Sequence, residues 1–136
     1  MEYSYKFRIY PNEEQINQIQ RTFGCCRFAY NHYLDKRIKA YEESKETLNY
    51  YACANDLTKL KSELEWLKEV DSTALQSSLR DLDTAYQNFF RGMKSGKSSG
   101  YPKFKSKHIR NRSYKSKIVG TNIAVTDNAV KLPKLG

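Results

Sequence analysis

The stretch Asp71–Met93, DSTALQSSLRDLDTAYQNFFRGM, decides the fold, because its apolar residues recur at intervals of three and four positions. These residues form an almost unbroken seam along one face of a helix: Leu75, Leu79, Leu82, Tyr86, Phe89 and Met93. Asp71 or Ser72 can cap the start of this helix. Glycines and serines at 92–100 predict a flexible loop after it.

Three more helices are predicted upstream of this one. The first covers 12–23 and ends at Gly24, the second covers 25–43, and the third covers 50–67. A helix, a glycine turn and a second helix within 12–43 have the spacing of a helix-turn-helix. Any antiparallel pair of helices in a bundle has the same pattern, so both interpretations stay open.

Strands are predicted at both ends of the chain. Residues 1–10 contain an alternation of aromatic or aliphatic with polar side chains, which indicates a strand with one buried face. Short runs with β-branched residues at 114–119, 122–125 and 129–132 predict further strands. Because a single strand cannot stand alone, we expect the first strand to pair with the later ones around a helical insert.

The positive charge is concentrated in one segment. The chain has 24 Lys+Arg, 15 Asp+Glu and a net charge of +9. Residues 91–117, here called the basic segment, carry no Asp or Glu, and the rest of the chain has 14 basic and 15 acidic residues, a net charge of −1. The cations are Arg91, Lys94, Lys97, Lys103, Lys105, Lys107, Arg110, Arg112, Lys115 and Lys117. Phosphate is the commonest partner of such a run, and interleaved aromatic rings argue against a disordered tail, so nucleic acid is predicted.

Several classes of protein are disfavoured. No apolar run approaches the ~18 residues that a membrane span needs, and the N-terminus lacks the pattern of a secretory signal, so we expect no membrane partner. The cysteines, Cys25, Cys26 and Cys53, are few and odd in number, which fits a reducing cytosol and predicts a cytoplasmic location.

Catalytic chemistry is hard to place on this sequence. The histidines are His32, expected to be packed or on the surface, and His108, within the basic segment. No spacing of the acidic residues forces several carboxylates onto one cation, and there is no Cys-x-x-Cys or phosphate-cradling glycine loop. We therefore expect no catalytic residue, no metal site and no cofactor in this chain.

Six blocks of sequence, taken together and in order, resemble one known family. They are 5–12 (YKFRIYPN), 22–31 (TFGCCRFAYN), 74–82 (ALQ followed by LRDL), 85–90 (AYQNFF), 101–105 (YPKFK) and 130–136 (VKLPKLG). This series resembles the N-terminal part of TnpB (OrfB), a family of transposon proteins of bacterial and archaeal insertion sequences. The resemblance covers nearly the whole chain.

The resemblance implies a fold and an activity. TnpB proteins are RNA-guided DNA endonucleases related to type V CRISPR effectors, and they begin with a helix-turn-helix or recognition part and a wedge part. The resemblance implies an α+β fold. About four helices would be inserted between an N-terminal strand and the C-terminal strands of an incomplete oligonucleotide-binding-type β-barrel. The implied domains are 1–10 (first wedge strand), 11–100 (helical recognition domain) and 101–136 (basic segment and remaining wedge strands).

The resemblance also implies partners and site residues. The partners would be guide RNA from the transposon end and duplex DNA beside the target. Tyr50 and Gln76 match places where the family approaches the target-adjacent motif; otherwise Tyr50 is a partly buried helix-start residue and Gln76 an ordinary surface residue. Tyr101 and Phe104 would stack on bases or pack beneath the basic loop. The full predicted nucleic-acid-binding set is Arg8, Tyr50, Gln76, Lys94, Lys97, Tyr101, Lys103, Phe104, Lys105, Lys107, Arg110, Arg112, Lys115 and Lys117.

The sequence stops at Gly136, ahead of the family's RuvC-like nuclease and its zinc-binding cysteine pairs. The expectation is therefore a truncated member that binds nucleic acid and does not cleave alone, monomeric unless an exposed barrel edge associates. Two alternatives remain open. One is a stand-alone helix-turn-helix regulator of the element, which would dimerise, and the other is a decayed remnant with a marginal fold.

Overall fold

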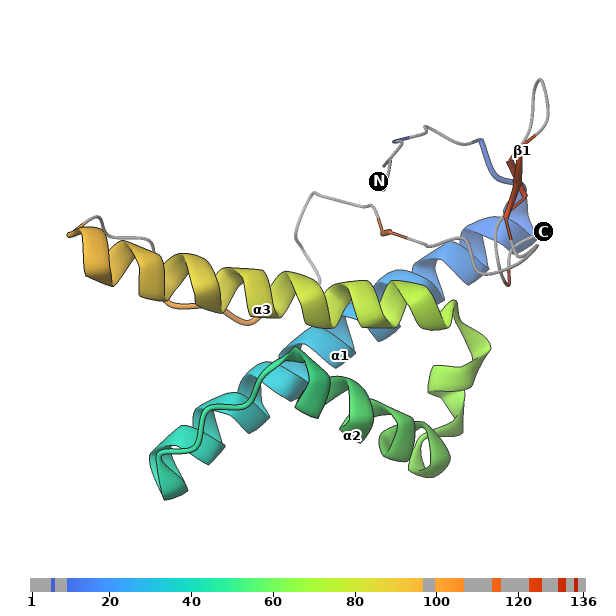
Figure 1. The fold of residues 1–136 in the computed structure, drawn as a ribbon. Helices are drawn as coiled ribbons and strands as arrows, with labels where there is room; N and C mark the ends of the chain where they lie inside the picture. The colour runs from blue at the N-terminus through green and yellow to red at the C-terminus, as the bar shows by residue number, and fades with distance from the viewer. Residues whose placement is uncertain are drawn as a thin grey trace.

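The computed structural model describes residues 6, 10–96, 100–106, 114–115, 123–125, 130–131 and 134. Its elements are α1 (Glu13–Ser44), α2 (Tyr50–Glu63), the 3-10 helix η1 (Glu65–Glu69), α3 (Ser72–Ser95), and two short strands, β1 (Ala124–Val125) and β2 (Val130–Lys131). Figure 1 shows α3 lying across α1, with α2 packed below the crossing and η1 leading back to the start of α3.

Helix α1 is one continuous helix, so the predicted break at Gly24 is wrong. Asn12 caps its start in a capping box, in which its side chain accepts from the Gln15 N–H and the Gln15 side chain accepts from the Asn12 N–H. A glycine inside a helix costs only about 1 kcal/mol relative to alanine, and burial of its neighbours Cys25 and Ala29 offsets that cost. The helix ends at Lys45, whose backbone is left-handed (φ 55°).

The predicted third helix, 50–67, is divided in two. Asn49 caps α2 by accepting from the Ala52 N–H at 2.9 Å. Leu64 leaves the helical region (φ −114°, ψ 84°), and η1 follows it. The division turns Leu67 and Val70 inward, where both are at most 2% exposed.

Helix α3 confirms the prediction made from the Asp71–Met93 seam. Asp71 is the N-cap and accepts from the Thr73 N–H at 3.0 Å, while Gly96 ends the helix with a left-handed backbone (φ 71°). Leu75, Leu79 and Leu82 are at most 1% exposed. They pack with Tyr33 and Leu34 of α1, which are fully buried, to form the core.

Polar contacts join α1 to both α3 and α2. The Arg37 guanidinium, 6% exposed, donates from Nη2 to Asp83 Oδ1 on α3 at 2.7 Å and lies 4.7 Å from the centre of the Tyr86 ring. On the α2 side, the Tyr33 hydroxyl and Lys36 Nζ both donate to Asp56 Oδ2, at 2.8 and 3.0 Å.

The α+β fold with an incomplete β-barrel and about four helices is a wrong prediction. In the described part of the chain there are three α-helices and one 3-10 helix, and its strands are the two-residue pair β1 and β2, antiparallel with Val125 opposite Val130. A pair this short cannot build a barrel wall. The predicted strand at 1–10 lies outside the described residues except for 6 and 10.

The three C-terminal strand predictions have different outcomes. The strands β1 and β2 lie within the predicted runs 122–125 and 129–132, whereas the described residues of 114–119 form no strand. Of the predicted strand 114–119, Tyr114 and Lys115 are described and belong to no strand; the Tyr114 ring packs edge-on against Phe23 of α1 at 6.0 Å. Local alternation in a short run is weak evidence for a sheet when helices can bury the same rings.

We predict that Arg37→Met lowers the free energy of unfolding by about 3 kcal/mol, because it leaves the partly buried Asp83 without its guanidinium partner. Urea denaturation of the full chain measures this change. Lys39→Met is the matched control, because Lys39 pairs with Asp35 on the exposed surface of the same helix. Equal destabilisation by the two variants would contradict the prediction.

Candidate nucleic-acid interface

Asn31 holds one end of the stretch 100–106 on α1. Asn31 Nδ2 donates to the Lys105 carbonyl at 3.0 Å, and the Lys105 N–H donates to Asn31 Oδ1 at 2.7 Å. The carboxamide thus pairs with the backbone of Lys105 as a neighbouring strand would. The Lys105 ammonium lies 4.4 Å from the centre of the Tyr30 ring, one residue before Asn31.

Tyr101 anchors the start of the described stretch 100–106. Its hydroxyl is 2.8 Å from that of Tyr86, and its ring meets Tyr86 and Phe89 edge-on, at 5.4 and 5.1 Å. Burial, and then the hydrogen bond with Tyr101, raise the pKa of Tyr86. The next residue, Pro102, is buried. Tyr101 therefore packs on α3 in this structure, and 43% of its side chain remains exposed.

Farther along, the basic segment contacts the first half of α3. Lys115 Nζ lies 3.5 Å from Asp81 Oδ1, with both side chains largely exposed. Tyr101 thus contacts α3 at Tyr86 and Phe89, whereas Lys115 contacts it nearer its start, at Asp81. Lys103 and Lys105 are on the surface along this course, and the Phe104 side chain is 54% exposed.

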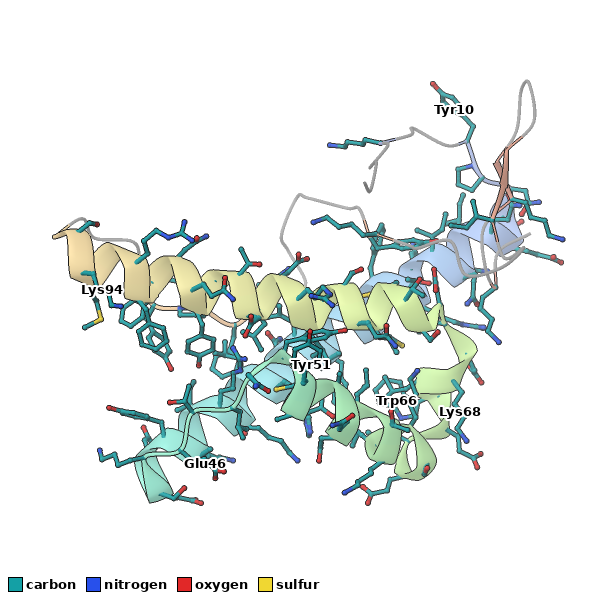
Figure 2. All side chains as sticks on the ribbon, in the orientation of Figure 1. Tyr10, Glu46, Tyr51, Trp66, Lys68 and Lys94 are labelled. Carbon is teal, nitrogen blue, oxygen red and sulfur yellow. The ribbon has the colours of Figure 1, made fainter. Side chains whose placement is uncertain are left out.

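A second group of candidates lies where α2 begins beside α3. The Arg80 guanidinium covers one face of the Tyr50 ring at 4.1 Å, and Tyr51 meets Tyr50 edge-on at 5.2 Å. Tyr50 also packs against the core, whereas Gln76 is exposed one helical turn before Arg80. Figure 2 labels Tyr51, which is 66% exposed, at the start of α2.

The structure thus brings Tyr50 next to Arg80, a residue absent from the predicted set. The signal that could have found it is its spacing of four from Gln76, because such a pair lies on the same face of a helix. Since Arg80 covers the face of Tyr50, the exposed group here is the guanidinium.

The remaining predicted residues have mixed placements. Lys94 is exposed near the end of α3, and Lys115 is exposed apart from its contact with Asp81. Six predicted residues lie outside the described residues: Arg8, Lys97, Lys107, Arg110, Arg112 and Lys117.

The described residues offer no metal-binding group of three or more His, Cys, Asp or Glu side chains. Burial raises the pKa of all three cysteine thiols, that of Cys26 to about 11, which disfavours their thiolates as nucleophiles or ligands. Burial lowers the pKa of His32, whose ring stacks on Phe28 at 5.4 Å. His32 therefore packs as a neutral ring, as one of its two expected placements had it.

None of the helices among the described residues is both long and apolar enough to cross a membrane.

Comparison with known proteins gives several matches. A family model of OrfB proteins of the IS605 type, described as a helix-turn-helix domain, matches residues 1–46. A Streptomyces pristinaespiralis protein named "Putative RNA-guided DNA endonuclease" is 41% identical over 106 residues, which is 76% of this chain and 25% of that protein. The Escherichia coli K12 protein named "Putative RNA-guided DNA endonuclease InsQ" is 33% identical over 135 residues, 98% of this chain and 32% of that protein. The Salmonella dublin "Virulence protein VsdF" is 33% identical over 112 residues, 76% of this chain and 92% of that protein.

The matching family model is that of a helix-turn-helix domain, although residues 13–44 form one continuous helix in this structure. The chain belongs to the TnpB (OrfB) family, which confirms the resemblance found in the sequence. It spans about a quarter and a third of the length of the Streptomyces and E. coli relatives, respectively.

We predict that Asn31→Ala releases the stretch 100–106 while leaving the helices folded, because both hydrogen bonds to Lys105 are lost. Each such bond contributes about 1 kcal/mol, so trypsin should cleave after Lys103 and Lys105 at least about fivefold faster. Limited proteolysis followed by mass spectrometry measures this. Asn17→Ala, an exposed asparagine on the same helix, is the control. Unchanged cleavage in Asn31→Ala would show that other contacts hold the segment.

Proposed function

We propose that this chain is the nucleic-acid-binding portion of a TnpB-like RNA-guided DNA endonuclease. In this proposal the basic segment holds guide RNA, and the α2–α3 surface approaches duplex DNA beside the target. The observation that carries the proposal is that a segment whose charged residues are all cationic contacts folded helices. Asn31 positions the backbone of Lys105, and Lys103 and Lys115 remain at the surface.

The contacts that hold the stretch 100–106 in place before any ligand binds support a role with RNA. A cation on a free tail loses conformational entropy when it meets a phosphate, whereas a backbone already held by Asn31 and Tyr101 loses less. Contacts of Lys and Arg with phosphates position a protein on the nucleic-acid backbone but do not distinguish one base sequence from another. This fits a guide-holding surface, because base pairing reads the sequence in an RNA-guided nuclease.

The α2–α3 surface supports a role with duplex DNA. A guanidinium can donate two hydrogen bonds to O6 and N7 of guanine, and a carboxamide can pair in the same way with adenine. Stacking on Tyr50 restricts the Arg80 fork to one plane, and Gln76 lies one turn away on the same exposed side of α3. In this proposal Arg80 and Gln76 contact base edges, and Tyr50 acts by orienting Arg80.

A binding titration of the full chain at two salt concentrations tests the function. The ligands are RNA from the transposon end, a random RNA of equal length and a duplex DNA. We predict preferred binding of the transposon-end RNA, with an affinity that falls steeply as salt rises, because each neutralised phosphate adds about 0.7–0.9 to the log–log slope. Binding of the duplex without competition from RNA would favour the stand-alone regulator. No binding to any ligand would refute the proposed function.

We predict that Arg80→Ala weakens duplex binding about tenfold or more through loss of a bidentate contact, and changes RNA binding by less than about twofold. Fluorescence anisotropy with both ligands measures the two affinities. Lys68→Ala is the charge-matched control, because it removes an exposed cation from η1. Lys68 also lies far from Lys94 of the basic segment, as Figure 2 shows. An equal loss for duplex and RNA would assign Arg80 to general phosphate attraction.

A further inference from the structure

The apolar seam of α3 extends beyond the helices that cover it. Leu75, Leu79 and Leu82 are buried and Tyr86 is 8% exposed, but Phe90 is 46% and Met93 is 66% exposed. Figure 1 shows the yellow and orange end of α3 projecting past α2, while the second half of α1 diverges from it. The seam therefore ends in an uncovered patch, here called the aromatic tip: Phe89, Phe90, Met93 and Tyr101.

Ring–ring and cation–ring contacts hold the rings of the aromatic tip in defined orientations. The Arg37 guanidinium lies over Tyr86 at 4.7 Å, and Tyr86 stacks on Phe90 with ring centres 6.2 Å apart and planes 26° apart. Tyr101 and Phe90 each pack against Phe89, at 5.1 and 5.5 Å. A line of stacked planar groups therefore starts at the buried Arg37 and ends at Phe90, which is half exposed.

The surroundings of the aromatic tip are cationic. Arg91, Lys94 and Lys103 are exposed, and the sequence has no acidic residue from 91 to 117. Figure 2 shows that the acidic Glu46, which follows the end of α1, lies apart from Lys94 near the end of α3. A polyanion with flat apolar faces matches this combination of rings and charge.

We propose that the aromatic tip binds unpaired bases of a single-stranded nucleic acid, with Phe90 stacking on a base and Arg91, Lys94 and Lys103 contacting phosphates. The proposal rests on the proposed nucleic-acid-binding function and adds that the ligand at this patch is single-stranded. In a duplex the faces of the bases are already stacked on one another. Phe90 could therefore stack on a base only if that base first left the duplex stack, which costs free energy. A second copy of this chain fits less well, because pairing two tips would bring their cations together.

The test compares two fluorescent oligonucleotides of equal length, oligo-dT and an abasic strand that has the same phosphates without bases. We expect Phe90→Ala to weaken binding of oligo-dT at least about fivefold, and to leave binding of the abasic strand within about twofold. Phe90→Trp should restore or exceed wild-type binding, because tryptophan also stacks. Tyr41→Ala is the matched control: its ring is 54% exposed on α1 and outside the aromatic tip.

Each other outcome overturns the proposal. Equal losses for oligo-dT and the abasic strand would assign Phe90 to folding or to general attraction, and unchanged binding of oligo-dT would remove it from the interface. A wild-type dimer that Phe90→Ala converts to a monomer, measured by light scattering, would assign the aromatic tip to self-association. Persisting duplex and RNA binding in any of these cases would leave the proposed function standing, whereas absence of all nucleic-acid binding would refute both.

Discussion

The Arg37 guanidinium is the constraint on which the arrangement of the helices depends. A buried charge needs a partner, and the partner of Arg37 is Asp83, held in turn by Gln87 at 2.8 Å from its second oxygen. Sliding α1 along α3 by one turn would part this pair and leave a charge inside the molecule. Arg37 Nε is buried without an acceptor among the described residues, which adds to the cost of burying this guanidinium. Desolvation offsets much of the attraction within a buried pair, but separating the pair is costly, so it restricts the register of α1 on α3 and with it the position of the aromatic tip.

The helical part of the fold was predictable because its signals are local and strong. The α3 seam, the Asn12 capping box and the Asp71 cap each occur within a few residues of one another. The errors came where a tertiary contact overruled a local rule. Gly24 does not end a helix whose neighbouring residues are buried against α3, and the turn after Glu63 is set by burial of Leu67 and Val70. The barrel was expected from resemblance and from short alternating runs, and the described part of the chain contains only one pair of two-residue strands.

The positive charge of the candidate site could be predicted from the sequence, but the contacts among its residues could not. A run of cations without acids is visible in the sequence, and it pointed to the basic segment. That Tyr101 packs on Tyr86, and that Arg80 covers Tyr50, depends on contacts between residues distant in the chain, which spacing does not show. Asn31 lies within the TFGCCRFAYN block that carries the family resemblance, but its bond to a backbone 74 positions away could not be inferred from that block.

The separation of Asn31 and Lys105 also has a kinetic consequence. The two residues are 74 positions apart, but once α1 and α3 are packed, only the stretch 100–106 still has to reach Asn31 for the pairing to form. The stretch 100–106 can therefore detach and return while α1 and α3 stay packed against each other. A ligand that takes over the contacts of Lys105 with Asn31 would therefore displace this stretch and leave the leucine core of α3 buried.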